Sequence, residues 1–132
     1  MASEDLTEGG GMARLPDDAV VVRGGQNLPE NFSRGTGVTA EAGGALQGIS
    51  VNVGDGLFAD ELTAPNPETG YPGILNNQVG VTTVGAIRAL GGEVESSPTK
   101  ANPHHATLSG LTAEQASELF CPTVRNPTRR KR

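Results

Sequence analysis

Glycine and proline interrupt this chain so often that every helix and strand must be short. The 132 residues include 19 glycines and 9 prolines, about a fifth of the sequence, just below the range at which disorder becomes the default interpretation. Apolar residues make up 35% and aromatic residues only 3%, so the chain can bury one modest core. We therefore expect one domain with a compact centre, long loops and loose ends.

Short apolar runs predict the strands. Residues 19–23 form a continuous β-branched run that ends at two glycines, which is typical of a buried strand. Residues 45–53 alternate between apolar and polar side chains, which indicates a strand with one buried face. Shorter strands are expected at 93–96 and 104–110. Residues 66–77 are rich in turn-forming residues and predict a surface loop.

Two segments carry helix start and stop signals. One covers residues 82–90, where a threonine can cap the helix and Gly91 ends it. The other covers residues 112–120 and begins with a Thr-x-x-Gln capping box. Helical turns are expected at 29–32 and 57–62. The fold class predicted is α+β: a small single domain with several short strands, two short helices and long Gly/Pro-rich loops.

Charge is distributed unevenly along the chain, whose net charge is −5. Residues 1–17 form an acidic stretch without periodicity, predicted to be a flexible leader, and residues 18–124 are predicted to form the α+β domain. Residues 125–132 carry five of the ten basic side chains and are predicted to form a flexible tail. The remaining acidic body would repel a phosphate backbone, so RNA binding would need a local pocket or the tail. The tail residues proposed for RNA are Arg129, Arg130, Lys131 and Arg132; a merely solubilising tail is the other interpretation.

The single cysteine, Cys121, cannot form an intramolecular disulfide, which favours a reducing compartment. No run reaches the roughly 18–20 apolar residues that a membrane-spanning helix needs, so no membrane partner is expected. The acidic start has no apolar core and does not resemble a secretory signal. We therefore expect a cytoplasmic protein, with Cys121 as a half-buried packing residue.

Arg23 is the first candidate for chemistry because it ends an apolar strand and precedes Gly24 and Gly25. Its guanidinium could form a fixed fork for phosphate or carboxylate, and the glycines would let a ligand approach the backbone closely. The alternative is an arginine that only reaches from the strand end into solvent.

The segment RGGQNLPENFSRG resembles the arginine region of the mono-ADP-ribosyltransferase toxins, the cholera- and pertussis-like group. In that family an arginine ends the first strand and is followed by a proline, an acidic residue, an apolar anchor and a glycine. The same order occurs here as Arg23, Pro29, Glu30, Phe32 and Gly35.

Two later motifs follow the family's order. Ser50 in GISVN is similar to the family's serine strand, although the full Ser-Thr-Ser triplet is absent, and Glu93 and Glu95 in GEVES match its Glu-x-Glu pair. The resemblance implies that Arg23 contacts NAD and that Ser50 supports the NAD-binding pocket, where Gly24 would let the ligand approach the backbone closely. It also implies that Glu95 stabilises the oxocarbenium-like transition state when nicotinamide leaves. Two glutamates that face solvent together on an exposed strand are the alternative.

His105 and Thr107 form a His-x-Thr pair whose side chains share one strand face. A histidine can act as general acid or base near neutrality, and a hydroxyl can hold a phosphate oxygen. The pair resembles one half of the 2H phosphoesterase signature, and a metal-independent ribonuclease could combine it with Arg23 or Arg34. Alternatively, His104 and His105 are structural residues of a loop. No third ligand is spaced to complete a metal site, so no metal is predicted.

Three functions therefore remain open, and whether the chain is an enzyme is one of the open questions. The first is a small toxin-like or effector-like mono-ADP-ribosyltransferase or other NAD-consuming domain, with a protein target or an antitoxin or immunity partner. The second is a ribonuclease toxin, and the third is a non-catalytic adaptor. The first requires Arg23 and Glu95 in one cleft, the second requires an arginine near His105, and the third requires no cleft.

Overall fold

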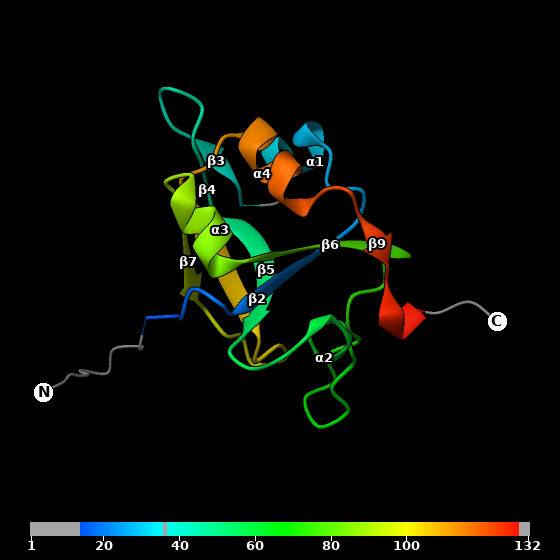
Figure 1. Cartoon of the computed structure of the whole chain (residues 1–132). Coiled ribbons are helices and arrows are strands. Elements are labelled where there is room, and N and C mark those ends of the chain that lie inside the picture. Colours follow the sequence, from blue (N-terminus) through cyan, green and yellow to red (C-terminus); the bar gives the residue numbers. More distant parts are fainter. Residues whose placement is uncertain (1–13, 36, 130–132) are drawn as a thin grey trace, which may run out of the picture.

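The computed structural model describes residues 14–35 and 37–129, and its centre is an antiparallel six-stranded sheet (Figure 1). The strand order is β7-β8-β5-β2-β6-β9, and a separate ribbon joins β3 to β4. The strands of the sheet are β2 (Val20–Gly24), β5 (Ile49–Gly54), β6 (Gln78–Thr83), β7 (Glu93–Ser96), β8 (His105–Ser109) and β9 (Val124–Arg125); those of the ribbon are β3 (Thr39–Ala40) and β4 (Leu46–Gln47). This mixture of helices and antiparallel strands is the predicted α+β class.

The helices begin where the sequence signals indicated. Pro29 occupies the first turn of α1, and the Thr83 hydroxyl accepts a hydrogen bond from the Ala86 amide at the start of α3. Thr112 and Gln115 form the predicted capping box of α4. The helical elements are α1 (Pro29–Ser33), α2 (Ala59–Leu62), α3 (Val84–Ala89), α4 (Ala113–Phe120) and a 3₁₀ helix, η1 (Pro127–Arg129).

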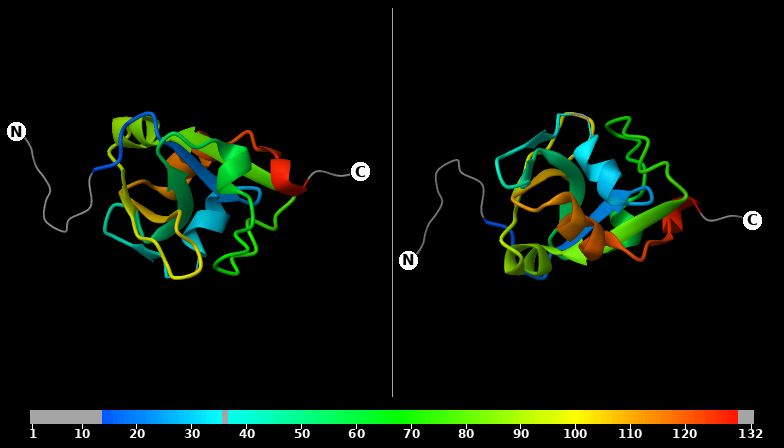
Figure 2. Two further views of the ribbon diagram at one scale, coloured as in Figure 1. Left: turned by 90° about the horizontal axis from the view of Figure 1, so that it is seen from below. Right: turned by 90° about the horizontal axis from the view of Figure 1, so that it is seen from above.

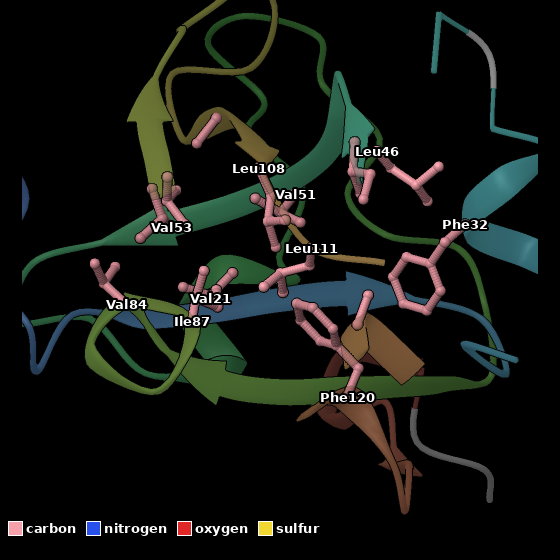
Figure 3. Close-up of a cluster of buried hydrophobic side chains, with 14 of the residues drawn as sticks. Val21, Phe32, Leu46, Val51, Val53, Val84, Ile87, Leu108, Leu111 and Phe120 are labelled. Carbon is pink, nitrogen blue, oxygen red and sulfur yellow. The ribbon is translucent and has the colours of Figure 1, made fainter. Parts of the chain in front are cut away.

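One face of the sheet carries the main apolar core. Helices α1, α3 and α4 cover this face, whereas α2 lies on the other (Figures 1 and 2). The rings of Phe32 and Phe120 pack with their centroids 5.8 Å apart between the helices and the sheet (Figure 3). The opposite face buries only a small cluster formed by Val22, Leu62 and Val79.

The sheet forks beside β2. Pairing between β2 and β5 ends at Val22 and Asn52, although β2 stays paired with β6 as far as Gly24, and β5 stays paired with β8 back to Ile49. Beyond that point β2-β6-β9 and β5-β8-β7 are two separate branches. Arg23 is the first residue of β2 past the fork.

Several elements depart from the sequence-based expectations, among them the short elements β3, β9 and η1, which were not predicted. Residues 78–83 form strand β6, which was not predicted because its β-branched run continues directly into the α3 helix pattern. The predicted strand at 45–53 is divided into β4 and β5 at Gly48, whose φ of 89° lies in the left-handed region that favours glycine.

The domain extends beyond both predicted boundaries. Leu15 packs against the core and the Asp17 carboxylate pairs with Arg88, so residues 14–17 do not belong to a flexible leader. At the other end, Arg125 pairs in β9 and Asn126 is fully buried, so the predicted tail is structured as far as η1. The rest of the predicted leader and Arg130, Lys131 and Arg132 of the predicted tail lie outside the described residues. Among the described helices, none is long and apolar enough to cross a bilayer.

Candidate functional site

A cavity of about 440 Å³ opens where the sheet forks, and we call it the fork cavity. Both branches contribute to its wall, together with the loop that precedes β6. Four predicted site residues line it: Arg23 with its neighbour Gly24 and, from distant parts of the chain, Ser50 and His105. The remaining lining residues are Val22, Val51, Asn52, Tyr71, Gly73, Ile74, Leu75, Asn76 and Asn102.

A second cavity of about 500 Å³ adjoins the first at Arg23, Gly24 and Asn76, which line both. We call it the amide cavity because carboxamide side chains dominate its wall. Its other lining residues are Gly25, Gln26, Asn31, Asn77 and Gln78. The two cavities together form a groove in two parts that meet at Arg23.

The Arg23 guanidinium is held by the turn that follows β2. Its Nη1 donates to Asn27 Oδ1 at 2.8 Å and its Nη2 donates to the Asn31 carbonyl at 3.2 Å, while its Cζ lies 4.3 Å from the centroid of the Phe32 ring. The buried Nε has no hydrogen-bond partner, and no ion pair involves Arg23 among the described residues. Burial lowers the pKa of Arg23 from its ordinary value. A half-buried cation without a carboxylate partner is suited to an anionic ligand.

The two glycines after Arg23 allow the loop before β6 to lie against β2. A Cβ on Gly24 would collide with Asn76 Oδ1 and Ile74 Cγ2, and Gly25 has a φ of 102°. Asn27 closes the turn, since its Nδ2 donates to the Arg23 and Gly25 carbonyls. The glycines expected to let a ligand approach the backbone are therefore present, but the loop before β6 already occupies part of the space next to Gly24.

His105 is held from both sides of its ring. Its Nδ1 lies 3.0 Å from the Ser97 carbonyl oxygen and 3.0 Å from Ser97 Oγ, and its Nε2 lies 3.2 Å from Ser50 Oγ. Because a carbonyl can only accept, Nδ1 carries the proton of the neutral ring and the Nε2 lone pair faces Ser50. Thr107 contacts Ser97 Oγ at 2.9 Å and supports this arrangement from outside the cavity wall.

Buried amides connect the fork cavity to the loops around it. Asn52 Nδ2 donates to the Leu62 carbonyl at 2.8 Å and to the Tyr71 hydroxyl at 3.1 Å, and Asn52 Oδ1 accepts from Asn102 Nδ2 at 2.9 Å. Tyr71 therefore keeps its own hydroxyl proton for a further acceptor. Asn52, Tyr71 and Asn102 were not predicted as site residues from the sequence. Signals existed in the polar phase of the strand at 45–53 and in the chain's single tyrosine.

Neither glutamate of the predicted pair lines either cavity. Glu93 is bound by the Arg88 guanidinium at 2.8–3.1 Å, which lowers the pKa of that carboxyl. Glu95 is exposed and stands opposite Thr107, which in turn stands opposite Ser50. Since neighbouring strands lie about 4.8 Å apart, roughly 10 Å separates the backbones of Glu95 and Ser50.

The other candidates lie away from the groove. Arg34 is the C-cap of α1 and lines neither cavity. His104 also lines neither cavity; its backbone amide donates to Asn102 Oδ1 and its carbonyl accepts from the Val53 amide of β5. The half-buried Cys121 thiol lies 3.4 Å from the Asn27 carbonyl oxygen. Across residues 14–35 and 37–129, no group of three or more His, Cys, Asp or Glu side chains is arranged to hold a metal ion.

The site therefore belongs to a small α+β protein whose forked antiparallel sheet brings an arginine, a serine and a histidine to one cavity. No protein family, curated protein or solved structure gives a significant match to this chain.

Proposed function

We propose that this chain binds NAD in the two-part groove and breaks the bond between nicotinamide and ribose, transferring ADP-ribose to an acceptor. The observation that carries the proposal is the meeting of Arg23 and Ser50 in one cavity. The family resemblance implies that Arg23 contacts NAD and that Ser50 supports the NAD pocket, and the two residues come from different branches of the fork. His105 joins them there.

The shape of the groove favours a dinucleotide. NAD consists of two nucleosides joined by a diphosphate, and both cavities are lined by Arg23, whose guanidinium lacks a carboxylate partner among the described residues. The diphosphate belongs at Arg23, where charge-assisted hydrogen bonds would offset the cost of burying the cation. The amide cavity offers donors and acceptors of the kind that bind the edge of adenine.

The fork cavity offers the groups needed at the other end of the ligand. Departure of nicotinamide leaves positive charge on the ribose, and Ser50, Asn52 and Tyr71, whose side chains carry oxygens, line the cavity in which this charge would develop. His105 Nε2 is placed to take a proton from an attacking hydroxyl. The role for Glu95 that the resemblance implies requires its carboxylate to reach the ligand from outside the cavity.

A ribonuclease is the second candidate, because His105 and Arg23 line the same cavity. The net charge of −5 disfavours it, since the acidic body of the chain would repel a long RNA backbone. A non-catalytic adaptor has no need for this groove. We place the activity in the cytoplasm, with a protein as acceptor and an antitoxin or immunity protein as the natural inhibitor.

Isothermal titration with NAD and an assay of nicotinamide release test the proposal, and total RNA serves as a parallel substrate. Arg23→Ala should weaken NAD binding by about 10- to 150-fold, the equivalent of losing one charge-assisted interaction of roughly 1.5–3 kcal/mol. Arg34→Ala is the matched control and should bind NAD like the original chain. Defined RNA cleavage without NAD binding would favour the ribonuclease, and activity on neither would exclude both enzymes.

A further inference from the structure

We propose that Ser50 is a nucleophile that carries ADP-ribose covalently, with His105 as its general base and Ser97 as the residue that positions the histidine. The inference rests on the proposed function and deepens it, because it specifies a reaction in two displacements at the ribose C1′. The residues come from β5, β8 and the segment just after β7.

The hydrogen bonds assign the role of each atom. The Ser97 carbonyl fixes the Nδ1–H tautomer, so the basic Nε2 faces the Ser50 hydroxyl at 3.2 Å. Ser50 therefore directs its proton to the ring, and the lone pairs of Oγ remain for a ligand in the fork cavity. A nucleophile within reach of a base, which a third group orients in turn, is the general arrangement of an activated hydroxyl.

The first displacement is balanced in atoms and charge. The Ser50 proton moves to Nε2, Oγ forms a bond to C1′, and the bond from C1′ to the pyridinium nitrogen breaks. Its electron pair stays on the ring, so nicotinamide leaves as a neutral molecule. In the second displacement the oxygen of an acceptor hydroxyl or of water forms a bond to C1′, and the bond from C1′ to Oγ breaks with its electron pair staying on Oγ. The imidazolium returns a proton to Oγ, and the proton of the attacking group then passes through His105 to solvent.

This chemistry matches the surroundings of Ser50 better than acyl transfer does. An acyl-transfer site needs fixed donors aimed at a developing oxyanion. In the cavity wall the Asn52 amide is already used as a donor towards Leu62 and Tyr71, so it is not free to bind an oxyanion. No oxyanion forms at C1′, so glycosyl transfer does not need such donors.

Mass spectrometry of the full chain, quenched with acid at a series of times after mixing with NAD, tests the covalent step. We expect an adduct of one ADP-ribosyl group, which peptide mapping places on Ser50, and an initial burst of nicotinamide. Ser50→Ala should lose the adduct and slow release by about 10²–10⁴-fold, the range for losing an activated group. Ser33→Ala, on the exposed side of α1, is the matched control and should keep both signals.

If the adduct does not accumulate, the configuration of the methyl glycoside formed in the presence of methanol tests the covalent step instead. With methanol as acceptor, two displacements at β-NAD retain the β configuration in the methyl glycoside, whereas direct attack gives the α product. Retention that is lost in Ser50→Ala supports the inference. Inversion, or undiminished nicotinamide release by Ser50→Ala, overturns it and leaves the proposed function standing. Absence of NAD binding and of nicotinamide release in the original chain overturns both.

Ser97 is tested by a separation of kinetic constants. Ser97→Ala keeps the carbonyl but removes the hydroxyl that contacts His105 and Thr107. We expect kcat to fall with KM unchanged, and Ser97→Thr to restore kcat. If Ser97→Ala lowers both kcat and the free energy of unfolding, and threonine restores neither, Ser97 has a structural role only.

Discussion

The two faces of the central sheet differ in what they bury. The face beneath α1, α3 and α4 holds a continuous apolar core that includes Val21, Ile49 and Phe120. The other face buries a small apolar cluster and, next to it, the amides of Asn52 and Asn102. Because burial of apolar area is the main source of stability, the first face stabilises the fold. The second face is left for polar groups that serve the groove.

The fork in the sheet explains how groups from both of its faces reach one cavity. While the sheet is continuous, it separates the two faces, and a ligand can touch only one of them. Past Val22 and Asn52 the branches diverge, so Arg23 from the core side and His105 from the polar side reach the same cavity. The forked sheet thus brings together groups that one intact sheet would keep apart.

The largest effect is expected in the apolar core. Phe120 is fully buried against Phe32, and Phe120→Ala should lower the free energy of unfolding by about 3–5 kcal/mol through lost contacts and a residual cavity. Phe58→Ala is the matched control because that ring is 67% exposed, and it should change stability by no more than about 0.5 kcal/mol. Urea denaturation measures both, and equal effects would contradict the assignment of the core.

A smaller but clear effect is expected on the polar face. Asn52→Leu leaves the Leu62 carbonyl and Asn102 Nδ2 without their partner, which should cost about 1–3 kcal/mol of unfolding free energy. Removing the exposed Asn77 carboxamide should change little by the same measurement. If Asn52→Leu instead stabilises the chain, the amides are not satisfied as described.

The sequence predicted most local elements because their signals are local. The β-branched run before Arg23 and the capping box at Thr112 each specify their own structure. Strand β6 was missed because its valines and threonines are compatible with both the strand and the start of α3. Its strand conformation is set by pairing with β2 and β9, which lie far away in the chain.

The site was predictable in part for the same reason. A charged residue at a strand end and a histidine on a strand are visible in sequence, and both line the cavity as Arg23 and His105. The contribution of residues 66–77 to the cavity wall could not be predicted, because turn-forming residues do not reveal which surface a loop covers. This loop is held against the sheet by the Asn126 carboxamide, which donates to the Ile74 and Asn76 carbonyls.

The ion pair of Glu93 with Arg88 should contribute a small, pH-dependent effect. Arg88 lowers the pKa of Glu93 in the folded chain, so the contribution is present above the ordinary carboxyl pKa and is lost as pH falls through the lowered value. Glu93→Gln should therefore lower Tm near neutral pH, and the difference from the original chain should close in acid. The side chain is 42% exposed, so we expect less than about 1 kcal/mol. A difference that persists unchanged in strong acid would contradict an electrostatic origin.

Substitution of Glu95 should give the smallest effect on stability. It is a useful partner to Glu93→Gln because the two glutamates differ only in their surroundings. Within the described residues no hydrogen bond or ion pair involves its carboxylate, so Glu95→Gln should leave Tm unchanged at neutral pH. Nicotinamide release should also persist, because the carboxylate lies outside both cavities. If Glu95→Gln abolished release while NAD still bound, the carboxylate must reach the ribose by movement of β7 towards the fork, and it would take over the stabilising role assigned here to the oxygens around Ser50.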